Sequence, residues 1–442
     1  MRAGAAIRDI SPGEPLPLCG YPESPVSTGV HDPLYIAAFY LSDGKTRTLY
    51  LTADLCFFAR PRAERIAGKI AEATGVPAAN VMLAATHTHY APATDCDIYR
   101  EVLGPELCPD YMDFVQAQAV EAAMEAVGTA FEARLAWKVG CCGREQGIGG
   151  NRHDPDRFAQ DPSVTVLALQ DETDRIRGIL VNYALHPTVL DTRNSLVTAD
   201  YVAYVRQTVG REYPDAVFGF MQGCSGNQSS RWFRREQTFQ EAERFGSAVG
   251  AEALRLLRSI EFRPVDSPLR LCKLEFMPSQ VRHIPPLETA AAQADSARSA
   301  YGEAVKAGVP EAMRRSAECT MLGAEQMELY ARGAEHYGAS TILSTTVPVV
   351  LQLLALDELA IVGIGAEVFA EAGLAVKART PFPVTMLSCL TGGCPCSYLC
   401  ADYAYDQFCY EAAGSLFARG TAGELTDTIL NNLNLLSDGD IL

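Results

Sequence analysis

Two histidines, His87 and His89, follow a short apolar run in the stretch NVMLAATHTHYAP. The run, residues 81–85, predicts a buried strand whose polar end emerges at the edge of a sheet. Alternation along a strand would point both imidazoles to the same side. A lone core histidine is most often structural, but strand ends are where α/β sheets place their ligand sites. The pair therefore indicates metal coordination or proton transfer.

Two further residues have the chemistry of metal ligands. His186 stands in NYALHPTVL, where the following proline keeps it in an extended conformation. Glu367 stands in IVGIGAEVF, whose glycines let backbone or ligand approach closely. Two imidazoles, a carboxylate and an open position are what a catalytic zinc ion requires, and such a zinc ion supplies hydroxide near neutral pH. The pattern therefore predicts a zinc site with water as the nucleophile.

Three segments that position these residues share one plan, a strand, a polar turn and a second apolar strand. They are residues 34–55, 164–189 and 349–371, and the last two lead to His186 and Glu367. Amphipathic helices are predicted between them, at residues 61–74, 109–127, 201–213 and 238–257. Strands that alternate with helices indicate an α/β fold, and the hairpins make its β-sheet core mixed rather than purely parallel.

Residues 286–337 are rich in Ala, Glu and Arg and predict a helical hairpin that breaks near residues 307–310. The hairpin is either a separate lobe or lid, or an ordinary packed insertion. No Ser-rich or Pro-rich linker divides the chain. We therefore expect one domain over residues 1–442, with the hairpin inserted in it.

The chain of 442 residues is acidic, with 37 Lys and Arg against 54 Asp and Glu and a formal net charge of −17. Such a surface repels phosphate backbones and anionic lipids, so we expect no nucleic acid and no stable membrane insertion. No apolar run approaches the ~18–20 residues of a spanning helix, and the first residues contain no signal-peptide core. We therefore expect a cytoplasmic protein, whose oligomeric state the sequence leaves open.

Fourteen cysteines are spread along the chain, and without a secretion signal we expect most to be reduced thiols. The densest group has two interpretations, small buried thiols or a site in which cysteines bond to each other or to a metal. Its members are Cys389, Cys394, Cys396, Cys400 and Cys409. Four other histidines belong to no motif that indicates a function: His31, His153, His283 and His336.

Five stretches, in order, resemble the catalytic amino-terminal domain of the neutral/alkaline, non-lysosomal ceramidases: NVMLAATHTHYAP, VNYALHPTVL, MQGCSGNQSSR, GIGAEVFAEAGLAVKAR and YLCADYAYDQFCYEA. The opening segments AAIRDISPGEPLPLCGY and GVHDPLY are also similar to the start of that family. The resemblance thus runs from about residue 2 to about residue 436. It implies a zinc-dependent amidohydrolase of lipid metabolism, with one zinc ion per chain.

The resemblance assigns metal ligands to residues that match the family's motifs. It implies that His87, His186 and Glu367 bind zinc. The fourth ligand of the family is a tyrosine, which falls on Tyr398. A phenol can complete the metal shell or move away from it, which suits a site that must admit substrate.

Three further matches lie on the substrate side of the family's site. The resemblance implies that Tyr410 and Arg152 stabilise the oxyanion formed at a carbonyl. It implies that His89 lies beside the zinc water and substrate, where proton transfer contributes about 10² to 10⁴ in rate. Ser229 and Asn227 either line the substrate pocket or belong to a loop that caps the next helix.

The chain also departs from the ceramidases. We expect no carboxy-terminal immunoglobulin-like domain, and this expectation favours a smaller or more soluble amide than ceramide as the substrate. The family's G-D-x-S-P-N element reads GNQSSR here, and no G-x-S-x-G elbow provides a serine nucleophile. The leading interpretation is a zinc hydrolase of a linear amide, with a small-molecule or lipid-like substrate. The alternatives are an ester, a lactone, a cyclic amide or a glycan-derived substrate, or a non-catalytic, metal-stabilised binding protein.

Overall fold

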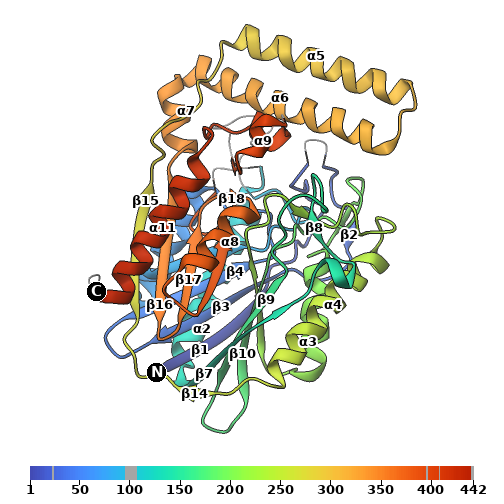
Figure 1. The fold of residues 1–442 in the computed structure, drawn as a ribbon. Coiled ribbons are helices and arrows are strands. Elements are labelled where there is room, and N and C mark those ends of the chain that lie inside the picture. The colour runs from blue at the N-terminus through green and yellow to red at the C-terminus, as the bar shows by residue number, and fades with distance from the viewer. Residues whose placement is uncertain (22–23, 95–106, 395–396, 408, 440–442) are drawn as a thin grey trace.

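A computed structural model of the chain describes residues 1–21, 24–94, 107–394, 397–407 and 409–439. Three larger sheets lie side by side at the centre, and helices cover their outer faces (Figure 1). Two sheets have five strands, in the orders β5-β4-β3-β1-β6 and β12-β10-β9-β7-β14, and the third has four, β15-β16-β17-β19. The predicted α/β fold with a mixed sheet core is confirmed.

The first sheet contains the hairpin of β3 (Tyr35–Ser42) and β4 (Arg47–Ala53), paired antiparallel from Ile36↔Ala53 to Ser42↔Arg47. Helix α1 (Arg60–Thr74) then returns the chain to β5 (Val81–Ala85), which pairs parallel with β4. All five residues of β5 are buried. The predicted hairpin and the predicted buried strand are both confirmed.

The other two sheets repeat this plan. The hairpin of β9 (Ser163–Gln170) and β10 (Ile176–Tyr183) leads through α3 (Tyr201–Glu212) to the parallel strand β12 (Val217–Gln222). The hairpin of β16 (Val349–Leu356) and β17 (Leu359–Ile364) leads through α8 (Ala370–Arg379) to β19 (Val384–Cys389). Parallel strands end at the same edge of their sheet. In each of these sheets, the loops that follow the two parallel strands therefore lie together at that edge.

The remaining strands and helices complete the layers. Helix α2 packs on β1 and β3, α4 on β7 and β9, and α11 on β15 and β16. The predicted helices appear with shifts of only one residue at their ends, because their apolar faces had to meet a sheet. Bounds not yet given are β1 (Arg2–Asp9), β6 (Phe131–Glu132), β7 (Arg134–Cys141), β14 (Arg263–Pro264), β15 (Arg270–Phe276), α2 (Pro109–Gly128), α4 (Phe239–Leu257) and α11 (Thr421–Asp438).

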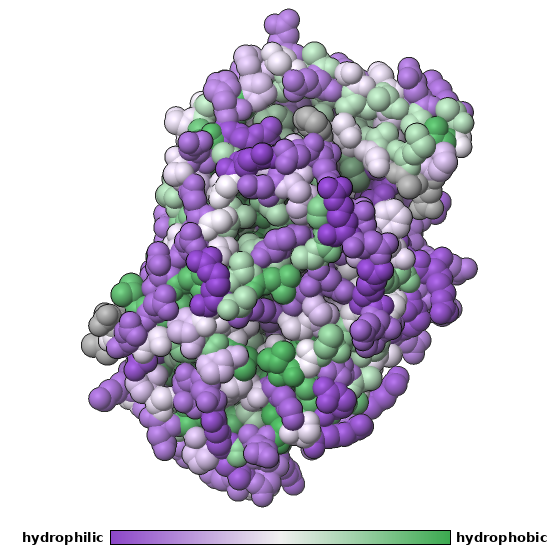
Figure 2. Space-filling model, in the orientation of Figure 1, coloured by the Kyte–Doolittle hydropathy of each residue, from purple (hydrophilic) through white to green (hydrophobic). Residues whose placement is uncertain are grey.

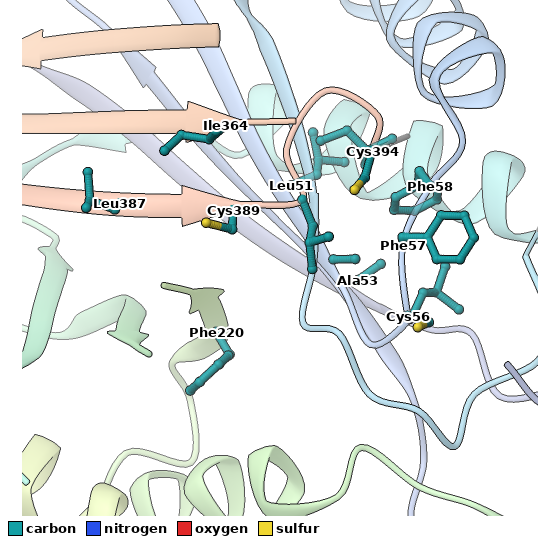
Figure 3. Packing of buried hydrophobic residues seen from close by; sticks show 14 of the residues in the cluster. Leu51, Ala53, Cys56, Phe57, Phe58, Phe220, Ile364, Leu387, Cys389 and Cys394 are labelled. Carbon is teal, nitrogen blue, oxygen red and sulfur yellow. The ribbon is translucent and has the colours of Figure 1, made fainter. Parts of the chain in front are cut away.

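The core lies where the three sheets meet, and Figure 3 shows within it Leu51 of the first sheet, Phe220 of the second, and Ile364 and Leu387 of the third. Buried polar contacts join the sheets as well. The Thr52 hydroxyl donates to the carbonyl of Phe220 at 2.6 Å. The Asn182 amide donates to the carbonyl of Leu387 at 2.9 Å. Each buried donor thus has a partner in another sheet, which sets the relative position of the loops that follow.

A long helical hairpin stands at one end of the molecule, in yellow and orange in Figure 1. It consists of α5 (Leu287–Lys306) and α6 (Glu311–Tyr337), and α7 (Ala339–Thr346) leads back to the sheets. Helix α6 packs on the short helix α10 (Tyr410–Ala413). At Gly323 a Cβ atom would lie only 2.9 Å from the carbonyl oxygen of Tyr410, so the hairpin rests directly on that helix.

The surface in Figure 2 is mostly hydrophilic, with apolar residues in small separate patches. No helix in the described part of the chain is long and apolar enough to span a bilayer.

Candidate metal centre

His87, His186 and Glu367 converge at the end of the sheets that lies beneath the helical hairpin. His87 follows β5, His186 follows β10, and Glu367 begins the two-residue strand β18 (Glu367–Val368) just after β17. The Nε2 atoms of the two histidines are 3.1 Å apart. Glu367 Oε2 lies 3.2 Å from Nε2 of His87 and 3.3 Å from Nε2 of His186. Each of the three side chains thus lies just after a strand of a different large sheet.

Backbone carbonyls hold both imidazoles in place. His87 Nδ1 donates to the carbonyl of Cys56 at 2.8 Å, and His186 Nδ1 donates to that of Ser225 at 2.7 Å. A carbonyl only accepts, so Nδ1 carries the proton and the Nε2 atom of each neutral ring presents a lone pair. Metal-binding histidines are typically oriented by such a second hydrogen bond.

The separations of these atoms fit a metal ion. Bonds of about 2.0–2.1 Å in a tetrahedral zinc site place neighbouring ligand atoms about 3.3 Å apart. Glu367 Oε2 is buried and has no hydrogen-bond partner, so two nitrogen lone pairs face a carboxylate oxygen without a proton donor. Such an arrangement is repulsive by itself and becomes favourable around a cation. The residues therefore fit the predicted zinc ion.

The protonation of two ligands agrees with this arrangement. Burial lowers the pKa of His186 to about 4, so its ring is neutral at physiological pH. Burial alone would raise the pKa of Glu367, but its charge interactions and hydrogen bonds with His87 and His186, which act when either ring holds a second proton, keep that pKa well below its usual range. A neutral imidazole and an ionised carboxylate are the forms that bind metal.

The backbone at His87 differs from the expected strand. Its φ angle is +73°, in the left-handed region that non-glycine residues rarely occupy, and β5 ends at Ala85. Strand alternation therefore does not align His87 with His89, although their Nε2 atoms do converge to 3.3 Å. The explanation from alternation is wrong because the chain turns at His87, where its amide donates to the carbonyl of Leu55 at 2.9 Å.

His89 differs from the two anchored histidines. Its Nδ1 atom is buried without a hydrogen-bond partner, so no carbonyl fixes its tautomer. Its ring instead meets Tyr21 edge-on, with centroids 4.9 Å apart, and backs onto Gly20. Burial, together with the nearby His87 and His186, lowers its pKa well below the usual value. His89 is therefore neutral at physiological pH.

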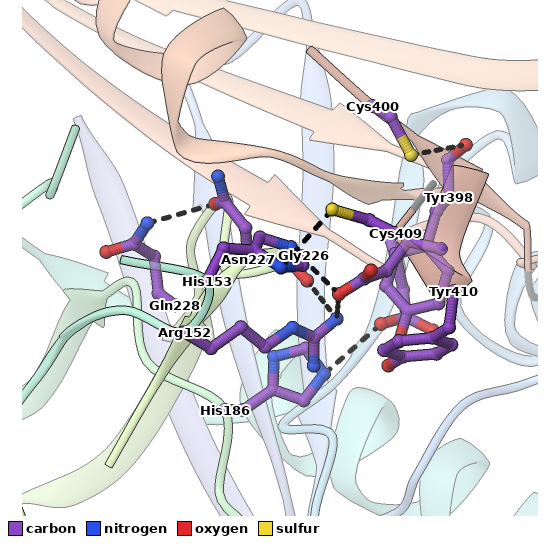
Figure 4. A network of polar contacts seen from close by, with 12 residues as sticks. Arg152, His153, His186, Gly226, Asn227, Gln228, Tyr398, Cys400, Cys409 and Tyr410 are labelled. Carbon is purple, nitrogen blue, oxygen red and sulfur yellow. Dashed lines mark hydrogen bonds and ion pairs between the residues drawn. The ribbon is translucent and has the colours of Figure 1, made fainter. Parts of the chain in front are cut away.

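Tyr398, Tyr410 and Arg152 form the more exposed side of the site (Figure 4). Strand β20 (Tyr398–Leu399) pairs with β18 so that Tyr398 stands opposite Glu367. The two tyrosine hydroxyls are 3.1 Å apart. The Arg152 guanidinium lies 5.5 Å from the Tyr398 ring centre and 5.1 Å from that of Tyr410. It also forms an ion pair of 2.6 Å with the fully buried Glu411.

Asn227 and Ser229 hold a loop beside the site. The Asn227 amide donates to Glu371 at 2.7 Å, and its carbonyl oxygen accepts from the amide of Ala370 at 2.9 Å, at the start of α8. Ser229 is buried, and its hydroxyl accepts from the amide of Arg231 at 3.2 Å. Both side chains thus have structural partners, and their predicted contact with substrate stays a prediction.

His153, which no sequence motif singled out, lies beside the substrate side of the site. Its Nδ1 atom lies 3.4 Å from the thiol of Cys409, and its Nε2 atom lies 3.3 Å from Glu411. The sequence did contain a signal for this cluster, because His153 directly follows Arg152, and Cys409 and Glu411 directly flank Tyr410. Burial would raise the pKa of Glu411, but the charges of Arg152 and His153 lower it to about 2.

The cysteines of the group near the carboxyl end that the structure describes form no disulfide. Cys389, Cys394 and Cys400 are buried, Cys409 is half-buried, and Cys396 lies outside the described residues. Cys389 approaches Cys224, with 3.6 Å between the sulfur atoms. Among the described residues, no group with metal-binding geometry contains two of these cysteines.

No protein-family model and no curated protein sequence matches the chain. The chain does match solved structures. The crystal structure of neutral ceramidase from Pseudomonas aeruginosa superposes with a TM-score of 0.76 and 19% identity, over 99% of this chain and 74% of that one. A ceramidase complexed with C2 superposes with a TM-score of 0.72 and 18% identity, over 99% and 75%. The chain has the neutral ceramidase fold.

The neutral ceramidase fold accounts for the whole described chain, including the repeated hairpin units. The resemblance that the sequence motifs indicated is thus confirmed at the level of the fold. In this ceramidase fold the motif residues come from separate segments, between positions 87 and 410, and meet at one end of the three sheets.

Proposed function

We propose that the chain is a zinc-dependent hydrolase that cleaves a linear amide, as a ceramidase does, in a small-molecule or lipid-like N-acyl compound. One observation carries the proposal. His87 and His186 each donate Nδ1 to a backbone carbonyl and turn Nε2 toward the unpartnered oxygen of Glu367. The similarity of the fold to neutral ceramidases supports the same chemistry.

His87, His186 and Glu367 would hold the zinc ion, and Tyr398 is proposed as the fourth ligand because it stands opposite Glu367 across the β18–β20 pair. Bound there, zinc supplies hydroxide near neutral pH and polarises the substrate carbonyl. The buried ligands form the floor of the site. The half-buried His89, Arg152, Tyr398 and Tyr410 face the side from which substrate arrives.

Tyr410 and Arg152 stabilise the negative charge that develops on the carbonyl oxygen. Burial raises the pKa of Tyr410 above its usual value, so its hydroxyl stays protonated and donates a hydrogen bond. Arg152 adds a positive charge against both tyrosine rings. Glu411 fixes the orientation of this guanidinium by its ion pair of 2.6 Å.

His89 transfers the proton. Its neutral ring accepts a proton as water attacks and returns it to the departing amine, which must be protonated to leave. Nε2 of His89 lies 3.3 Å from Nε2 of His87, so it is adjacent to the metal ligands. Loss of this transfer lowers the rate by about 10² to 10⁴.

The test compares metal content and amide hydrolysis in wild type, Glu367→Gln and a matched control. Glu358→Gln makes the same change in the exposed turn before the same strand, β17. We expect zinc in wild type and Glu358→Gln, little in Glu367→Gln, and hydrolysis of N-octanoylethanolamine only where zinc is present. Zinc retained in Glu367→Gln, or hydrolysis without zinc, contradicts the proposal.

The same groups would serve an ester, a lactone, a cyclic amide or a glycan-derived acyl compound, so these substrates belong in the same assay. The predicted single domain and cytoplasmic location also remain proposals. Limited proteolysis and cell fractionation test them.

A further inference from the structure

Arg231 is a half-buried cation near the site whose charge is not paired with a carboxylate of any described residue. Its guanidinium makes no hydrogen bond or ion pair with any residue that the structure describes. The side chain lies against Trp232, with the guanidinium carbon 5.1 Å from the ring centre. The Trp232 indole donates to the carbonyl of Arg152 at 2.9 Å. This bond fastens the segment that carries Arg231 to the segment that carries the oxyanion-binding arginine.

Other cations surround this position. Arg234 donates to the carbonyl of Thr188 at 2.9 Å, two residues after the metal ligand His186. Arg315 comes from α6. Burial lowers the pKa of Arg231, Cys319 acts in the opposite direction, and the charges of Arg315, Arg152 and Arg234 lower it further.

Helix α6 presents one face to the site. Arg315, Cys319 and Gly323 recur at intervals of four residues, so they share a side of the helix. Gly323 lies against Tyr410, and the field at Cys319 comes from Arg315, Glu411, Arg231 and Arg152. The hairpin thus lies against Tyr410, and Arg315 is on the same side of α6.

The charges at this approach do not cancel. Arg152 pairs with Glu411 at 2.6 Å, and Arg315 pairs with Glu318 at 2.8 Å. Neither Arg231 nor Arg234 forms an ion pair within the described residues. The remaining charge is positive, although the whole chain has a net charge of −17. A half-buried cation beside other cations is unfavourable unless an anion joins it.

We propose that the substrate is an amide that carries an anionic oxygen group, a carboxylate or a phosphate, and that Arg231 binds this group. The proposal rests on the proposed amidohydrolase function and names its substrate class. Guanidinium presents a planar fork of donors that matches carboxylate and phosphate oxygens, and it is weakly hydrated enough to bind them in a partly buried site. Arg234 and Arg315 add electrostatic attraction for the same anionic group.

The test uses three amides with one acyl chain: N-octanoylglycine, N-octanoylphosphoethanolamine and the neutral N-octanoylethanolamine. We expect wild type to have a higher kcat/KM for at least one anionic amide than for the neutral one. Arg231→Met keeps an unbranched chain against Trp232 and removes the charge. It should lower kcat/KM for the anionic amide about 10- to 100-fold, mainly through KM, as for hydrogen bonds to charged groups.

Controls separate specificity from folding and from net charge. Arg235→Met removes one charge from the same segment at an exposed side chain and should leave the ratio of anionic to neutral kcat/KM unchanged. Arg231→Lys should recover part of the preference, because lysine keeps the charge without the fork. Hydrolysis of the neutral amide at the wild-type rate shows that the variants are folded.

Each outcome decides the matter. An unchanged ratio in Arg231→Met, or a wild-type preference for the neutral amide, overturns the inference while hydrolysis itself upholds the proposed function. Hydrolysis of none of the three amides overturns both. A preference confined to the carboxylate or to the phosphate identifies which anion Arg231 binds.

Discussion

His87 Nε2 lies 3.1 Å from His186 Nε2, while the opposite nitrogen of each ring donates to a backbone carbonyl. These two hydrogen bonds thus orient the rings so that the lone pairs of both Nε2 atoms meet beside a carboxylate. This arrangement favours a bound cation, and such an ion would link metal binding to the stability of the fold.

Metal removal should therefore destabilise the protein. A chelator should lower the melting temperature, and zinc at about 100 times its Kd should restore about 2.7 kcal/mol. His186→Ala should abolish the response to zinc, whereas His283→Ala, at an exposed position, should retain it. Differential scanning calorimetry measures the shift, and an equal response in His186→Ala contradicts the assigned ligand.

Gly20→Ala should act through His89. The new Cβ atom would lie 2.4 Å from Cγ of His89, and the φ angle of +112° at this position disfavours any side chain. We expect kcat to fall by about 10² to 10⁴, as in His89→Ala, with zinc content unchanged. At Gly13 an added Cβ would meet no atom within 4 Å, so Gly13→Ala is the matched control. Wild-type kcat in Gly20→Ala would show that His89 is not held in this way.

The elements of the fold were predictable because their patterns are local. The apolar run of β5 and the turn Asp357-Glu358 between β16 and β17 each depend on neighbouring residues, and both appear as expected. His87, His186 and Glu367 could be proposed as ligands because each follows such a run. The choice of His87 over His89 as a ligand came from the family resemblance, since the distances between sheets are not encoded in any single segment.

Other features could not be predicted, because they depend on contacts between distant segments. His153 meets Cys409 and Glu411 across more than 250 positions, and no periodicity reports such a contact. The left-handed backbone of His87 depends on its hydrogen bond to Leu55 in another loop. The lack of a partner for Arg231 becomes visible only when every surrounding side chain is in place.

Glu411 should make stability depend on pH in acid. Its pKa is about 2 in the folded protein, against an ordinary value of 4.5. A depressed folded pKa contributes stability that is complete above about pH 4.5 and is lost as the pH falls through about 2. The difference corresponds to about 3 kcal/mol. Urea unfolding of wild type and Glu411→Gln, with chelator in all samples, should show curves that separate above pH 4.5 and approach each other toward pH 2. Parallel curves would contradict the assignment.

Cys409 should be dispensable for catalysis, although it lies 3.4 Å from His153 in a thiol–imidazole–carboxylate chain that ends at Glu411. Such a chain is the geometry of a cysteine nucleophile, which would compete with water as the attacking group. Burial, however, raises the pKa of Cys409 to about 12, so almost no thiolate exists at neutral pH. Cys409→Ala should keep kcat/KM within about threefold of wild type, well below the loss from removing a nucleophile. Mass spectrometry of wild type quenched during turnover should detect no acylated protein. An acyl adduct on Cys409, with activity lost in the variant, would replace metal-activated water by covalent catalysis.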